Sequence, residues 1–71
     1  MFALNAHIAG RVCGPSANGA HPKVPVGPCM IEAHEGVVSI IWVQGDEEAS
    51  IVISIMEFED YVQNRDIRIL P

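Results

Sequence analysis

The sequence predicts a single, mostly β domain: a small five-stranded antiparallel barrel with a long first loop and a short helical turn before the last strand. Three observations predict it. Apolar and polar residues alternate in the first run of the chain, short turn-forming connections separate three later β-rich runs, and one segment near the end has helical spacing. The length of 71 residues, 49% of them hydrophobic, provides one core and argues against disorder. We therefore expect residues 1–71 to form one domain.

The first run extends from Phe2 to Val12. Apolar side chains occupy one face and polar side chains the other, namely Phe2, Leu4, Ala6 and Ile8 against Asn5, His7 and Arg11. A period of two is typical of a half-buried strand.

A segment rich in glycine and proline follows, from Cys13 to Pro28. Because proline fixes φ and has no N–H to donate, we expect a long irregular loop here. Loops of this length are uncommon in compact domains and are often functional. Cys13, His21 and Cys29, in and beside the loop, are therefore the candidate loop site.

Three β-rich runs come next and predict an antiparallel meander, at Cys29–His34, Val37–Gln44 and Ala49–Met56. Their connections, residues 35–36 and 45–48, have the length of hairpin turns and contain glycine. After the meander, Phe58, Tyr61 and Val62 have helical spacing within Glu57–Asn64, and a last strand is expected over Ile67–Leu70.

The second and third runs of the meander are apolar on both faces. One face, with Val38, Ile40 and Trp42, is expected to fill the core. The other face carries the candidate oligomer interface: Val37, Ile41, Val43, Val52 and Met56. Because a domain of this size cannot easily bury both faces by itself, we expect a homo-oligomer, either a dimer or a tetramer.

The order of these elements resembles that of SH3-like small β-barrels, over nearly the whole chain. The alternative architecture is an open antiparallel sheet with one helix packed on it, which dimerises face to face.

The stretch Ser50–Ser54, followed by Phe58 and Tyr61, resembles the end of the type II plasmid dihydrofolate reductases. That family consists of small barrels that act as tetramers around a central pore. Its pore-lining strand reads Val-Gln-Ile-Tyr, whereas here Val52 stands in place of Gln and Ser54 in place of Tyr. Neither side chain offers the same hydrogen bonds, so the resemblance does not carry the activity over.

The candidate metal ligands are His7, Cys13, His21, Cys29 and His34. The close pairs typical of zinc sites are missing from their spacing, so we expect no metal and no cofactor. Either cysteine could pair with His21 or His34 as a nucleophile, but no thiol-protease signature surrounds them. We therefore assign no catalytic residue.

The formal net charge is -5, and every acidic residue lies at Glu32 or later. The four basic residues are scattered, which argues against nucleic acid as a partner. No apolar run approaches the length that spans a membrane, and no cationic leader precedes one, so we expect a cytoplasmic protein with free thiols.

These observations favour a small, non-enzymatic interaction module that self-associates through its apolar outer strand faces and has a possible protein partner. The alternative is an enzyme or small-molecule binder whose site forms at a subunit interface, as in the type II reductases. A third hypothesis is that the carboxylates after residue 31 bind a basic partner.

Overall fold

The computed structural model describes residues 2–15 and 22–70. The elements, in chain order, are β1 (Phe2–Ile8), β2 (Val12–Cys13), β3 (Lys23–Val24), β4 (Gly27–His34), β5 (Val37–Gln44), β6 (Glu47–Ser54), α1 (Ile55–Gln63) and β7 (Ile67–Ile69). The protein is therefore mostly β, with one helix directly before the last strand, as predicted.

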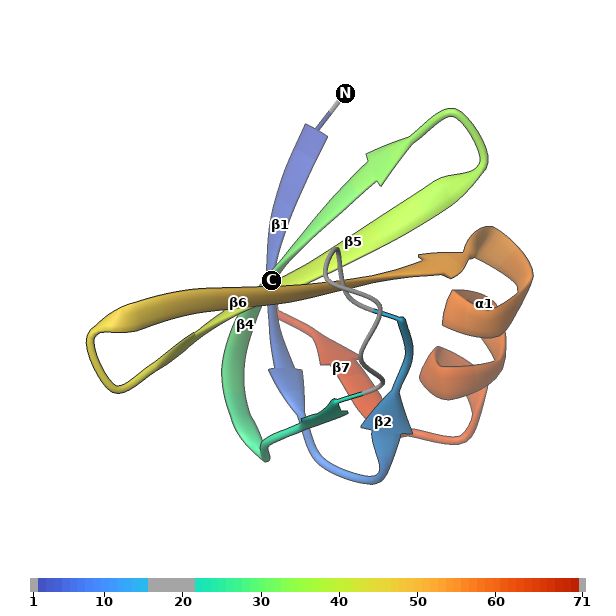
Figure 1. Ribbon diagram of the computed structural model, residues 1–71. Helices are drawn as coiled ribbons and strands as arrows, with labels where there is room; N and C mark the ends of the chain where they lie inside the picture. Colours follow the sequence, from blue (N-terminus) through green and yellow to red (C-terminus); the bar gives the residue numbers. More distant parts are fainter. Residues whose placement is uncertain (1, 16–21, 71) are drawn as a thin grey trace.

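Five strands form one antiparallel sheet in the order β6-β5-β4-β1-β7 (Figure 1). β1 joins the meander to the end of the chain, because Leu4 pairs with Ile31 of β4 and His7 pairs with Arg68 of β7. The other two strands, β2 and β3, pair with each other in a short ribbon.

The meander turns depend on residues with positive φ. Glu35 and Gly36 join β4 to β5 with φ values of 48° and 83°, as a type I′ hairpin turn requires. Gly45, with φ 66°, begins the turn between β5 and β6. This turn has two residues rather than the predicted four, since β6 already begins at Glu47.

The predicted first strand, Phe2–Val12, is too long. β1 ends at Ile8 because the next two N–H groups, of Ala9 and Gly10, both donate to the carbonyl of Asp66, at 2.8 and 3.2 Å. The chain bends there, and Val12 pairs with Val24 in the ribbon instead.

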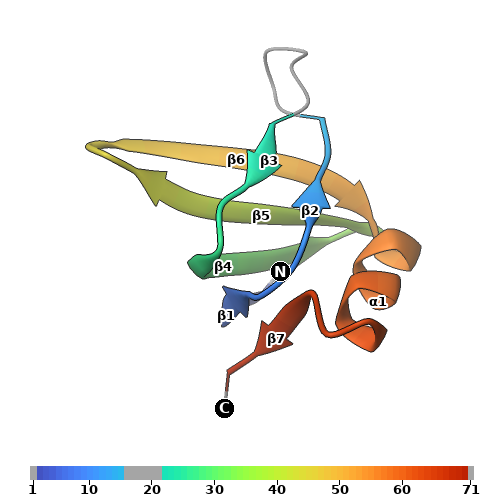
Figure 2. The same cartoon turned by 90° about the horizontal axis from the view of Figure 1, so that it is seen from below.

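The described parts of the predicted loop from Cys13 to Pro28, residues 13–15 and 22–28, contain more strand than expected. The loop contains β3 and one residue of β2, and its last two residues begin β4. The ribbon crosses one face of the large sheet (Figure 2). Val12 and Val24 are fully buried beneath it, and the N–H of Val52 on β6 donates to the carbonyl of Pro15 at 3.0 Å.

The core lies between the ribbon, the inner face of the sheet and the helix. Its buried residues are Ala6, Ile8, Val12, Val24, Cys29, Ile31, Val38, Ile40, Trp42, Ile51, Ile53 and Ile67. Val38, Ile40 and Trp42, which were expected to fill the core, are thus buried, as are Ala6 and Ile8 of the first run. Phe58, Tyr61 and Val62 of α1 pack against this core, as their spacing predicted.

The helix begins earlier than predicted. Ser54 is the last residue of β6 and also the N-cap, where its hydroxyl accepts from the N–H of Glu57 at 3.1 Å. The Glu57 carboxylate accepts from the N–H of Ser54 at 3.2 Å and completes a capping box. Ile55 and Met56, expected in the strand, therefore form the first turn of α1.

Gly14 provides a first prediction, because the ribbon reaches the core only through a close backbone approach. A Cβ atom at this position would lie 2.9 Å from Cγ2 of Ile53 and 3.3 Å from Cδ1 of Ile51. Gly14→Ala should lower the free energy of unfolding by about 1–3 kcal/mol, as overpacking does. Urea unfolding measures this change.

The control is the same substitution in an Ile53→Ala background, where the nearest contact is removed. In this background Gly14→Ala should lower the free energy of unfolding by clearly less than it does in the wild type, so that the effects of the two substitutions are not additive. Equal losses in both backgrounds would contradict the proposed contact.

Candidate functional site

The face of β5 and β6 that points away from the core is nearly free of charge. Its positions alternate with the buried ones, and the cross-strand register sets them side by side: Val37 with Ser54, Ser39 with Val52, Ile41 with Ser50, and Val43 with Glu48. Seven of these eight residues are uncharged, and Glu48 is the exception. We call these eight residues the outer face.

Four of the five predicted interface residues lie on the outer face. Val37, Val43 and Val52 are 39%, 71% and 43% exposed, and Ile41 is half-buried. The fifth, Met56, is 73% exposed but belongs to the first turn of α1. It is therefore not part of the strand surface on which the sequence placed it.

A groove of about 660 Å³ adjoins the outer face on the side of β4. Met30 and Ile41, which pair across β4 and β5, contribute to its lining together with Val43. The connection from Pro25 to Pro28 provides further lining. Sequence reasoning missed this groove, although Met30 and Glu32 alternate along their strand with the more buried Cys29 and Ile31.

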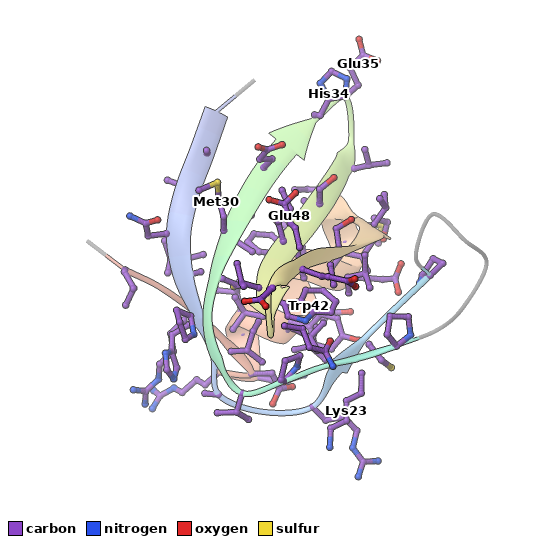
Figure 3. All side chains as sticks on the ribbon, turned by 60° about the vertical axis from the view of Figure 1, so that its left-hand side comes forward. Lys23, Met30, His34, Glu35, Trp42 and Glu48 are labelled. Carbon is purple, nitrogen blue, oxygen red and sulfur yellow. The ribbon has the colours of Figure 1, made fainter. Side chains whose placement is uncertain are left out.

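The polar side chains that line the groove are carboxylates and amides. The carboxylates are those of Glu32 and Glu48, and the amides are those of Asn5 and Gln44. Figure 3 labels three of the lining residues, namely Met30 on β4, Glu48 on β6 and Trp42 on β5. By strand register and burial, Met30 and Glu48 belong to the outer side of the sheet and Trp42 to the core. Among the described residues that line the groove, none is basic. Its electrostatic potential therefore favours a cation.

Gln44 is held at the edge of the groove by a tryptophan from the core. The indole Nε1 of Trp42 donates to its side-chain oxygen at 3.4 Å. The amide NH₂ of Gln44 retains two hydrogens that it can donate to a ligand.

The predicted loop site is not assembled in the part of the chain that the structure describes. Cys13 is exposed on β2, in the ribbon, whereas Cys29 is buried on β4, in the large sheet, and both thiols are free. His21 lies outside the described residues. Over residues 2–15 and 22–70, no three His, Cys, Asp or Glu side chains are grouped so that they could hold a metal ion.

The helix α1 is far shorter than a membrane-spanning segment. Within the described ranges, no helix is long and apolar enough to cross a bilayer.

Burial makes the two thiols chemically different. It raises the pKa of the Cys29 thiol, because the thiolate loses hydration in the core. Since the thiolate is the reactive form, we expect a thiol reagent to modify Cys13 in the folded protein and Cys29 only on unfolding. Mass spectrometry of the labelled chain, with Cys13→Ser as the control, measures this order. Equal rates for both thiols would contradict it.

The same raised pKa gives a pH dependence. The unfolded chain loses the Cys29 proton first, so stability is constant below the ordinary thiol pKa of about 8.5 and falls as the pH rises through the raised value. A Cys29→Val variant should lack this part of the decline, as urea unfolding at increasing pH would show. An identical decline in the variant would contradict the assignment.

Comparison with protein-family models, curated proteins and solved structures finds no match for this chain. The resemblances to SH3-like barrels and to the type II reductases therefore stay predictions. Val52 and Ser54, which stand in place of the reductase Gln and Tyr, have structural contacts here: Val52 donates its N–H to Pro15, and Ser54 caps α1.

Proposed function

We propose that the protein is a non-enzymatic interaction module that self-associates through the outer face of β5 and β6. The observation that carries this proposal is that seven of the eight residues on that face are uncharged, in a chain with a net charge of -5. Charged side chains are depleted at the centre of protein interfaces, because burying an unpaired charge is costly.

The composition of the outer face suits contact with a second copy of itself. Val37, Val43 and Val52 each expose more than a third of their surface, and removing apolar surface from water contributes about 25 cal/mol per Å². The serine hydroxyls between them both donate and accept, so symmetry-related serines can satisfy each other.

The outer face offers little for catalysis. Its eight residues include one carboxylate, that of Glu48, and the other seven are valine, isoleucine or serine. Acid-base or nucleophilic catalysis needs at least two positioned groups, one of them activated by the other. This composition favours the interaction module over the alternative of an enzyme whose site forms at a subunit interface.

Val52→Glu tests the proposal, because it places a charge at the centre of the outer face. We expect the wild type to self-associate at tens of micromolar in sedimentation analysis and the variant to be monomeric, since an unpaired carboxylate opposes burial. Ile69→Glu is the matched control. Ile69 is 39% exposed, close to the 43% of Val52, but lies on β7 at the other edge of the sheet.

A wild type that stays strictly monomeric at these concentrations would contradict self-association. Dissociation by Ile69→Glu, with Val52→Glu without effect, would place the contact elsewhere on the molecule.

Salt dependence provides an independent check. Copies that each carry a net charge of -5 repel one another, while an uncharged interface has no ion pairs to lose. Salt that shortens the screening length from about 30 to about 8 Å should therefore strengthen self-association. Weaker association in salt would contradict an interface on the uncharged face.

A further inference from the structure

We propose that the groove beside the outer face binds an extended peptide segment in which two basic side chains flank an apolar one. The groove has about 660 Å³, within the range of small-ligand sites. Met30, Ile41 and Val43 provide apolar lining, and Glu32 and Glu48 provide two carboxylates. Because the described lining contains no basic side chain, a ligand cation has no competitor from this chain within the groove.

The two carboxylates and one apolar residue lie on a diagonal across three strands. Glu32 of β4 pairs with Ser39, and Glu48 of β6 pairs with Val43, so Ile41 lies midway between the two pairs along β5. Diagonal neighbours on a sheet are about 7–8 Å apart, which places Glu32 and Glu48 about 15 Å apart with Ile41 between them.

This arrangement matches the spacing of an extended chain. Residues i, i+2 and i+4 of an extended segment share one face, and the outer two are about 13 Å apart. The flexible side chain of a lysine or arginine at each end spans the difference between this length and the separation of Glu32 and Glu48. The residue at i+2 then lies over Ile41 and Met30, which pair across the two strands.

The amides at the groove distinguish a peptide from a simple cation. Asn5, which pairs with Met30, can donate to the C=O groups and accept from the N–H groups of an extended backbone. Gln44, at the edge of the groove beside Trp42, can donate its NH₂. The indole N–H of Trp42 bonds the Gln44 oxygen and thereby directs its NH₂ group. Nucleic acid does not suit this site, because the two carboxylates repel its negatively charged phosphates.

The proposal does not rest on self-association, although the two surfaces share Ile41 and Val43. Met30 and Glu32 line only the groove, whereas Val52 belongs only to the outer face. The two surfaces can therefore be tested with different variants.

The experiment titrates the Val52→Glu variant with the capped peptide Lys-Ser-Val-Ser-Lys and follows backbone amide shifts by NMR. Val37→Glu replaces this background if the first variant is not folded. Two peptides serve as controls: Glu-Ser-Val-Ser-Glu reverses the charges, and Lys-Ser-Gly-Ser-Lys keeps the charges but removes the apolar side chain.

We expect saturable shifts at Met30, Val43 and Gln44 with the first peptide, much weaker binding of the glycine peptide, and none of the glutamate peptide. Salt should weaken the binding, because screening reduces the attraction between the charges. The pair Glu32→Gln and Glu48→Gln should reduce affinity about three- to thirtyfold, as expected for two exposed ion pairs.

Glu59→Gln with Asp60→Asn is the matched control, since it removes the same charge from the exposed surface of α1 and should leave affinity unchanged. Three results would overturn the proposal. These are no saturable shift at millimolar peptide, an affinity for the glycine peptide equal to that for Lys-Ser-Val-Ser-Lys, or an equal loss of affinity in the Glu32/Glu48 and Glu59/Asp60 double variants. None of these results bears on self-association, because the background variant is designed to be monomeric.

Discussion

The sheet has two faces, and the described elements of the chain cover one of them. The ribbon lies close enough to cover the inner face because Gly14 has no side chain where it meets Ile51 and Ile53. The carbonyl of the next residue, Pro15, then accepts a hydrogen bond from the N–H of Val52 on the edge strand β6. The helix completes this cover through Phe58, Tyr61 and Val62, and the hydroxyl of Tyr61 donates to the Cys13 carbonyl at 3.2 Å, which joins helix to ribbon. The outer face and the outer lining of the groove lie on the opposite side of the sheet, which these described elements do not cover.

Alternation was sufficient to predict that Ala6 and Ile8 point inward, because burial of one face imposes a period of two. On β5 and β6 both faces are apolar, so alternation alone does not identify the inner one. The errors arose where a distant residue decides the local conformation. β1 ends at Ile8 because Asp66, near the other end of the chain, accepts from Ala9 and Gly10. The groove depends on the pairing of Met30 with Ile41 and on a connection that composition alone describes as loop. At Ser54 the competition is local: the residue fits both the strand pattern and a capping box, and it has both roles.

The two proposed binding surfaces share residues, so their occupancies are linked. A second copy that covers Ile41 and Val43 leaves an incomplete groove, and a bound segment in the groove leaves an incomplete outer face. Binding at one surface therefore opposes binding at the other, and the coupling is reciprocal by thermodynamic necessity. A basic partner would act on this protein partly by changing the fraction that is self-associated.

The edge strand β6 has features that oppose edge-to-edge pairing with other chains. An exposed edge strand is a template for unlimited pairing with other chains. Two different features oppose such pairing at the two ends of β6. Near its end, the Val52 N–H is already bonded to Pro15 of the same chain. Near its start, Glu47 and Glu48 carry adjacent negative charges that repel an identical strand arriving edge to edge. The proposed self-association would therefore use the face of the sheet rather than its edge, and a face-to-face pair is complete after one partner has bound.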